Sequence, residues 1–198
     1  PYHPCTATYH YRAPSPVHAQ CVTFLSPIIH YSLVRILSLY CAFFGDTALN
    51  RKTFRDCMLN SGTARGQGWF MTAALYDKGD IAGAVTCNLS TGKFCEIVYV
   101  AVAVQHQLSG NGRKLVAVAA TLAQAAGVRE LVASAATDTL SFWASMPQVL
   151  GLPLVSLNDS PLWSGSAQYS SWKWEIYGQA FVDIRLLRCA VDAKANYV

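Results

Sequence analysis

One stretch limits what this chain can fold into. An apolar run from Ile97 to Val104 passes through a glycine turn into an alanine-rich helical segment. The run consists of β-branched, aromatic and small residues, which is typical of a buried strand. The turn, from Gln107 to Gly112, holds two glycines that let the backbone approach a ligand closely. Because a helix start offers unpaired N–H groups and a positive dipole end, this layout predicts an anion-binding loop.

Length and composition indicate a single globular domain. The 198 residues are 53% hydrophobic and 13% charged, which suits a packed core and not a disordered chain. The net charge of +4 comes from scattered Lys and Arg residues, without the basic tract that direct nucleic-acid binding favours. Seven cysteines without a Cys-x-x-Cys pair favour reduced thiols in an intracellular protein over disulfides or zinc. Because the chain begins at Pro1, we expect a fragment or a processed product.

The beginning of the chain predicts an irregular arm. Residues 1–20 are rich in Pro, His and Tyr and show no periodicity. His3, Cys5 and His10 match no zinc spacing. We therefore expect a loop with incidental His and Cys residues, and no metal in this protein.

Two helices and a hairpin are expected between the arm and the apolar run. Residues 28–44 are shorter than the about 20 apolar residues of a membrane span and include Arg35, so they predict a buried amphipathic helix. We expect no membrane association. Asn50 would cap the second helix, and Gly79 would supply a positive φ in the hairpin turn. The expected elements are helices over residues 28–44 and 50–59 and strands over residues 69–75 and 81–88.

After the glycine turn, the pattern predicts a helix and then a strand parallel to the apolar run. Gly127 is placed to end that helix, and a helical crossover requires parallel strands. Pro147 is expected to end or kink the helix that follows. The expected elements are a helix over 113–126, a strand over 130–136, a helix over 139–149, a weak strand over 154–157 and an alternating strand over 170–177. Residues 181–198 predict no element.

The order of these elements and one motif resemble a known superfamily. Gln107-x-x-Gly110-x-Gly112 matches the pyrophosphate-loop pattern of the GNAT superfamily of acetyl-CoA-dependent N-acetyltransferases. The resemblance implies an α/β (α+β) domain with the GNAT fold, in which helices cover both faces of a central mixed, mostly antiparallel sheet. It also implies an acetyl-CoA cleft between the glycine-loop strand and the next parallel strand. Residues 21–198 would form this single domain, with the best-supported core at 69–150.

A second motif narrows the resemblance. Residues 94–102, Phe-x-Glu-Ile-Val-Tyr-x-Ala-Val, resemble the core of nuclear histone acetyltransferases of the general-control-nonderepressible and PCAF type. Acetyl-CoA is the implied cosubstrate, with its pantetheine arm on the strand and its pyrophosphate on the N–H groups of the loop. The implied acetyl-CoA contacts are Val100, Ala101, Val102, Gln107, Leu108, Ser109, Gly110, Asn111, Gly112, Arg113, Thr139 and Phe142.

Glu96 is the expected general base. An amine must lose a proton before it attacks a thioester, and a carboxylate on an apolar strand suits this role because desolvation raises its pKa. Glu96 is the only acidic residue between Asp80 and Glu130, and it stands where the family's base stands. The alternative is a strand-end Glu that points to solvent. Cys95 could suggest a thiol nucleophile, but neighbours on a strand point to opposite faces, and no His is placed to pair with it.

The acceptor side departs from the family pattern. Phe142-Trp143 stands where the histone-acetylating class has Tyr-Phe and where many small-molecule GNAT enzymes have a Tyr as general acid. The segment 146–148, Met-Pro-Gln, replaces the superfamily's Gly-Phe. We therefore expect a mechanism that rests on Glu96 alone, with Trp143 near the bound acceptor.

Together these patterns predict a lysine N-acetyltransferase that acts on histone tails or other lysine-bearing proteins. The resemblance implies a nuclear protein in a chromatin complex; otherwise we expect a cytoplasmic one. A small-molecule amine acetyltransferase and a catalytically degenerate acetyl-CoA-binding or interaction domain remain alternatives. A dinucleotide-binding fold with Glu130 as the ribose ligand is disfavoured, because Leu115 occupies the third glycine position and hairpins join the preceding strands.

Overall fold

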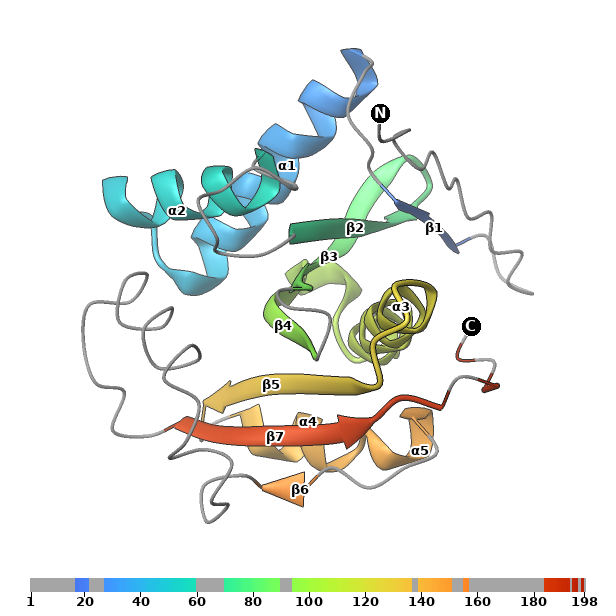
Figure 1. Ribbon diagram of the computed structural model, residues 1–198. Helices are drawn as coiled ribbons and strands as arrows, with labels where there is room; N and C mark the ends of the chain where they lie inside the picture. The colour runs from blue at the N-terminus through green and yellow to red at the C-terminus, as the bar shows by residue number, and fades with distance from the viewer. Residues whose placement is uncertain are drawn as a thin grey trace, which may run out of the picture.

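Within the described part of the chain, seven strands form one sheet (Figure 1). The computed structural model describes residues 17–21, 27–59, 70–89, 94–136, 139–150, 155–156, 184–192, 194–195 and 197. The strands are β1 (Val17–Cys21), β2 (Phe70–Asp77), β3 (Asp80–Asn88), β4 (Cys95–Val102), β5 (Glu130–Ala136), β6 (Val155–Ser156) and β7 (Ile184–Ala190). The helices are α1 (Pro27–Phe44), α2 (Ala48–Leu59), the 3₁₀ helix η2 (Val104–His106), α3 (Asn111–Ala125), α4 (Leu140–Ala144) and α5 (Pro147–Leu150).

The sheet has the order β1-β2-β3-β4-β5-β7-β6. Strands β4 and β5 pair in parallel, and every other neighbouring pair is antiparallel. Helix α3 connects β4 to β5, as a parallel pair requires. The expected mixed, mostly antiparallel sheet is therefore confirmed.

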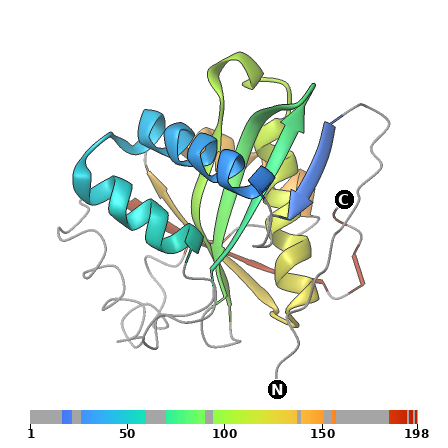
Figure 2. The ribbon, with the colours of Figure 1, turned by 90° about the horizontal axis from the view of Figure 1, so that it is seen from above.

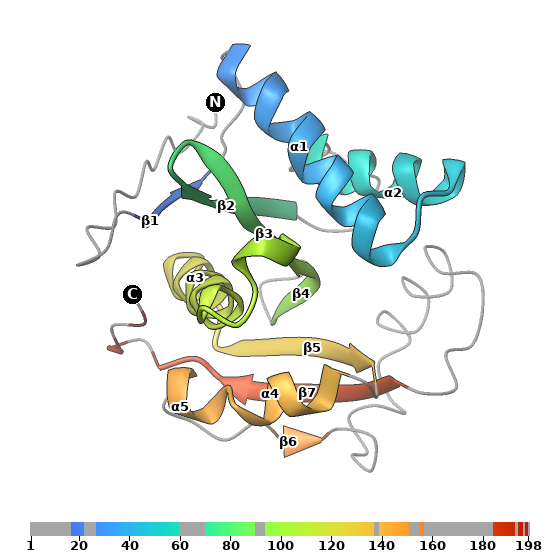
Figure 3. The same ribbon diagram turned by 180° about the vertical axis from the view of Figure 1, so that it is seen from behind.

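Two apolar clusters attach helices to the two faces of the sheet. Figure 2 shows α1 and α2 side by side on one face and α3 on the other. Helices α4 and α5 lie beside β5 and β7 (Figure 3), and Trp143, Met146 and Leu150 join the cluster under α3. The α3 cluster includes Val85, Ile97, Leu115, Val116 and Ala119, and the α1–α2 cluster includes Ile36, Tyr40, Phe54, Ala84 and Tyr99.

Most predicted elements agree with the structure to within two residues. The hairpin turn between β2 and β3 is Lys78-Gly79, and both residues have a positive φ, at 50° and 87°. Gly127 follows α3 with a φ of 71°, as predicted. Pro147 separates α4 from α5 and begins the second helix, because its missing N–H is harmless in a first turn.

The predicted cap of α2 is wrong. Helix α2 begins at Ala48, and the Thr47 hydroxyl accepts a hydrogen bond from the backbone N–H of Asn50 at 3.1 Å. The Asn50 side chain instead donates to the carbonyls of Phe44 and Gly45, both at 3.0 Å. It therefore ties the end of α1 to the start of α2.

Two segments without a predicted element are strands. The sequence predicts residues 17–20 as part of the irregular arm, but they belong to β1, which pairs with β2. Residues 184–190, in the tail, form β7 between β5 and β6. The weak strand over 154–157 is confirmed for Val155–Ser156. The strand predicted over 170–177 lies outside the described residues.

Gly83→Ala is expected to destabilise the fold by about 1–3 kcal/mol, the usual cost of overpacking. A Cβ at Gly83 would lie 2.8 Å from the carbonyl oxygen of Ala101 and 3.0 Å from Cδ1 of Leu115. The nearer atom is backbone, so β3 and β4 would have to move apart. Urea unfolding followed by circular dichroism measures the change, and a midpoint equal to that of the wild type would contradict the prediction.

Candidate active site

Strand β4 pairs with β5 along only part of its length. Its first three residues pair with β5, and the last of these pairs joins Ile97 to Ala133. Strand β4 continues to Val102 and β5 to Ala136, but no further pair joins them among the described residues. The two strands therefore separate after Ile97, at the place where the acetyl-CoA cleft was expected.

A bulge in β4 accompanies this separation. On β3, Thr86 pairs with Tyr99 and Cys87 pairs with Ile97, so Val98 is an extra residue in β4. Ile97 packs in the cluster under α3, whereas Tyr99 packs in the cluster under α1 and α2. Two such residues would share a face of a regular strand. The bulge therefore reverses which side chains of the second half of β4 point to each face of the sheet. A bulge also bends the strand that carries it.

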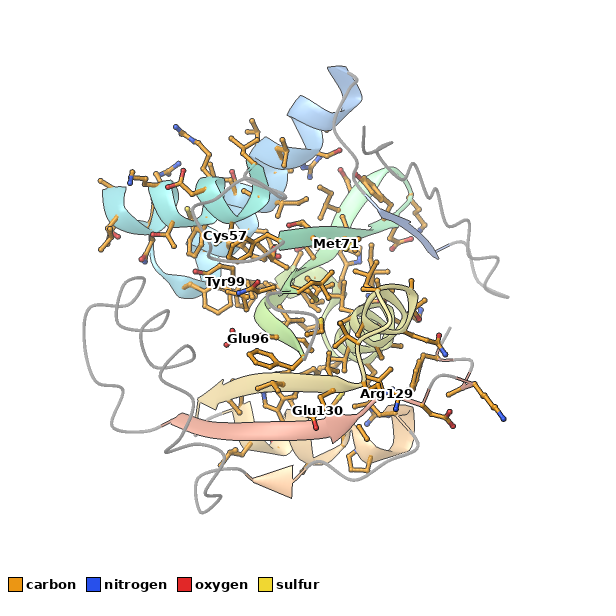
Figure 4. All side chains as sticks on the ribbon, viewed as in Figure 1. Cys57, Met71, Glu96, Tyr99, Arg129 and Glu130 are labelled. Carbon is orange, nitrogen blue, oxygen red and sulfur yellow. The ribbon has the colours of Figure 1, made fainter. Side chains whose placement is uncertain are left out.

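Glu96 lies in the paired half of β4, and 2% of it is exposed. Its neighbours Cys95 and Ile97 pack under α3, so the Glu96 side chain lies on the other face of the sheet. Figure 4 shows Glu96 on the side of Tyr99 and of Cys57 from α2. The alternative of a solvent-facing Glu at a strand end is therefore wrong.

The predicted anion loop between η2 and α3 is held by its own side chains. Ser109 Oγ donates to the carbonyl oxygen of His106 at 2.6 Å. Asn111 Nδ2 donates to the same oxygen at 3.0 Å and to Ser109 Oγ at 2.8 Å. Leu108 and Gly110 have positive φ values of 58° and 80°. Asn111, the buried first residue of α3, thus ties the loop to the helix.

The start of α3 fits a phosphate group. The helix begins at Asn111, two residues before the predicted start, with Gly110 at the N-cap. No side chain caps this end with a hydrogen bond. The backbone N–H groups of Asn111, Gly112 and Arg113 belong to the first turn of the helix, where no preceding turn supplies a carbonyl acceptor. These N–H groups and the positive end of the helix dipole suit the binding of a pyrophosphate.

Other predicted acetyl-CoA residues surround this loop. The Gln107 side-chain amide donates to the carbonyl of Val102 at 3.2 Å and so ties the loop to the end of β4. A Cβ at Gly112 would lie 2.7 Å from Cε2 of Phe142, so α4 packs directly against the loop. The predicted pantetheine contacts lie in the half of β4 that has separated from β5, at Val100, Ala101 and Val102.

Two predicted site residues, Thr139 and Trp143, lie in α4 or at its start and not in β4 or the loop. Thr139 is exposed and forms the N-cap of α4. Trp143 is buried in the cluster under α3, at 6% exposure, with its ring 5.1 Å from that of Phe142. Trp143 therefore has a packing role, and its contact with the acceptor stays a prediction.

Sequence reasoning missed two features of the site. Asn88 lies opposite Glu96 on β3 and is equally buried, at 2% exposure. His106, in η2, places its Nδ1 atom 3.4 Å from Oδ2 of Asp77 at the end of β2. No local sequence pattern predicts the Asn88–Glu96 or the Asp77–His106 pair, because both pairs depend on how β2, β3 and β4 align.

The described part of the chain contains no group of three or more His, Cys, Asp and Glu residues arranged to hold a metal ion. In the same residues, no helix combines the length and apolar character that crossing a membrane requires.

Comparison with known proteins gives one matching family. The model of the acetyltransferase (GNAT) family matches residues 33–145. No curated protein matches the sequence significantly.

Several solved structures are similar to this fold. The catalytic domain of the Tetrahymena GCN5 histone acetyltransferase, in complex with coenzyme A, has a TM-score of 0.62 at 9% identity, covering 93% of this chain and 99% of that one. A putative GNAT acetyltransferase from Desulfovibrio desulfuricans has a TM-score of 0.59 at 17% identity, covering 89% and 99%. N-acetylglutamate synthase from Neisseria gonorrhoeae, complexed with coenzyme A and N-acetylglutamate, has a TM-score of 0.57 at 15% identity, covering 88% and 35%. At these identities the likeness shows the fold.

The stability of the protein is expected to fall in alkaline solution because of Cys57. Burial raises the pKa of this thiol to about 12, with smaller effects from the charges of Asp56 and Glu96. A raised pKa in the folded state stabilises the fold at low pH, and this contribution is lost as the pH rises from about 9 toward about 12. The loss approaches about 1.4 kcal/mol per pH unit for this thiol.

Urea unfolding at several alkaline pH values measures this slope. Other groups also titrate there, so the test compares the wild type with Cys57→Ala. We expect a smaller slope for the variant, and equal slopes would contradict the prediction.

Proposed function

The chain belongs to the GNAT acetyltransferase family, whose model matches more than half of its length, and we propose that it transfers the acetyl group of acetyl-CoA to protein lysines. Histone tails are the first candidates. The observation that supports this best is the buried carboxylate of Glu96, on the strand that leads into the anion loop. Residues 94–102 around it resemble nuclear histone acetyltransferases, and a histone acetyltransferase is among the similar structures.

In this proposal the donor binds along β4 and the loop. The N–H groups from Leu108 to Arg113 bind the pyrophosphate, and the exposed Arg113 guanidinium adds positive charge. The backbone of Val100, Ala101 and Val102 binds the pantetheine arm, much as a strand edge binds an added extended chain. This role suits the half of β4 that does not pair with β5.

Glu96 then acts as the general base. It takes a proton from the lysine ammonium, through a water molecule, and leaves a neutral amine. The amine nitrogen attacks the thioester carbonyl carbon; a C–N bond forms, the C–S bond breaks, and the leaving CoA thiolate takes up the proton that the nitrogen loses. Cys95 has no part in this direct transfer, because it is fully buried and packs under α3.

A small-molecule amine is the second candidate acceptor. N-acetylglutamate synthase is among the similar structures, so this fold also serves small acceptors. The segment 146–148, Met-Pro-Gln, departs from the superfamily pattern on the acceptor side. A histone acceptor would imply a nuclear location and a chromatin complex, whereas a small acceptor would imply neither.

Glu96→Gln is expected to lower turnover with acetyl-CoA and a histone peptide by about 10²–10⁴, the usual contribution of a general base. The amide keeps the size of the carboxylate but cannot take the proton. Steady-state kinetics measures turnover, and calorimetry is expected to show unchanged binding of CoA. The matched control is Glu130→Gln, a carboxylate at the start of β5, which should turn over like the wild type.

A loss smaller than about tenfold in Glu96→Gln would exclude Glu96 as the general base. If the wild type itself fails to bind millimolar CoA, the catalytically degenerate interaction domain becomes the better description.

A panel of acceptors is expected to separate the two candidate substrates. We expect acetylation of histone H3 and H4 tail peptides with a kcat/KM at least about tenfold above that of polyamines and aminoglycosides, a difference of about 1.4 kcal/mol in transition-state binding. Mass spectrometry of the products measures the added acetyl groups. A preference for the small amines would overturn the protein-lysine proposal and leave the acetyltransferase activity intact.

A further inference from the structure

A His–Asp contact connects the start of the anion loop to the β2–β3 hairpin. His106 Nδ1 lies 3.4 Å from Asp77 Oδ2, and both side chains are largely shielded from solvent, at 19% and 26% exposure. Asp77 is the last residue of β2, directly before the tight Lys78-Gly79 turn. His106 directly precedes Gln107, the first residue of the loop motif. The pair therefore connects the β2–β3 hairpin to the segment from which the loop departs.

The backbone of His106 also organises the loop. Its carbonyl oxygen accepts the hydrogen bonds from Ser109 Oγ and Asn111 Nδ2. One residue thus holds the hairpin with its side chain and the loop with its carbonyl. Any movement of His106 would be transmitted to both of these hydrogen bonds.

The loop needs such support because its conformation is strained. Leu108 has a φ of 58°, a left-handed conformation that costs an L-residue about 1–2 kcal/mol. Its side chain is fully exposed, so packing of that side chain does not offset the cost. A strained backbone persists only where the surrounding structure holds it in place. The contacts of His106 provide a hold of this kind.

The hairpin end offers a second carboxylate that makes a natural comparison. Asp80 lies directly opposite Asp77 in the β2–β3 pairing, and like charges in such a position repel each other. Asp80 forms its own ion pair with Arg35 of α1, with the two atoms 2.7 Å apart. Each carboxylate therefore has a different basic partner, and of the two only Asp77 contacts the segment that leads into the loop.

We propose that Asp77 and His106 are positioning residues that hold loop residues 107–110 in the anion-binding conformation before acetyl-CoA arrives. This proposal rests on the proposed function, in which the loop binds the pyrophosphate. Without the pair, only a fraction of the molecules has the loop in place, and the apparent dissociation constant rises by the inverse of that fraction. The turnover of the bound complex should change little, because Glu96 lies near the start of β4 and the loop follows the end of that strand.

Two acetyl donors test this role. We expect Asp77→Asn and His106→Ala each to raise the KM for acetyl-CoA and the calorimetric Kd for CoA about two- to fivefold, in keeping with the modest strength of partly exposed polar pairs. The kcat with acetyl-CoA should stay near that of the wild type. S-acetylpantetheine lacks the pyrophosphate, so its kcat/KM should be the same in the variants and the wild type.

A double-mutant cycle tests whether Asp77 and His106 act through their mutual contact or independently of each other. If the two residues act only through each other, Asp77→Asn/His106→Ala should weaken CoA binding no more than either single change does. The matched control is Asp80→Asn, which removes the neighbouring carboxylate and its ion pair with Arg35. This control should bind CoA like the wild type.

The outcomes distinguish this proposal from the proposed function. Failure of the wild type to bind CoA would overturn the proposed function. If the wild type binds CoA and the two single variants match it, only the positioning role is overturned. Equal losses with acetyl-CoA and S-acetylpantetheine, or an equal loss in Asp80→Asn, would show a general structural effect and would also overturn it.

Discussion

The short pairing between β4 and β5 is the constraint on which the rest of the site depends. Three residue pairs and the crossover helix α3 connect the β1–β4 part of the sheet to β5, β7 and β6. Strand β5 pairs with β7 along its whole length and β4 stays paired with β3, so the sheet opens only between β4 and β5. The bulge at Val98 bends β4 at the point of departure. Backbone groups on the departing edge need partners, and an extended ligand can supply them.

Strand β4 also fixes the position of Glu96 relative to the anion loop. Its paired half buries Glu96 on the face of the sheet opposite α3, and its other half leads through η2 into the anion loop. Charged residues are seldom fully buried unless they are paired, so a carboxylate that is 2% exposed is an unusual feature of this strand. Because strand and loop are continuous, a donor held by the loop would lie along β4 toward Glu96. This continuity is why the protein-lysine proposal depends on β4 more than on any single residue.

The sequence predicted what local signals determine and missed what distant pairing determines. The apolar run, the glycine turn and the α3 stripe are continuous in the chain, and the structure has them within two residues of their predicted positions. Strand β7 was missed because residues 184–190 become a strand through β5 and β6, which lie elsewhere in the chain. The bulge at Val98 depends on the register with β3, and the Asp77–His106 pair depends on three strands. The place of Trp143 in a motif predicts a contact with the acceptor, which stays a prediction, whereas its packing under α3 depends on residues far away in the chain.

In the anion loop, the sequence motif identifies some residues by their type but does not predict the backbone conformation of others. Gln107, Gly110 and Gly112 could be recognised because their residue types are tied to tasks: the Gln107 amide reaches the Val102 carbonyl, Gly110 has a φ of 80°, and Phe142 packs where a Cβ of Gly112 would stand. Leu108 carries no such signal, since leucine does not favour its left-handed backbone. Its conformation must come from the surrounding contacts. Binding a doubly charged pyrophosphate would otherwise include the cost of ordering this loop, so contacts that order it beforehand leave more of the interaction energy for affinity.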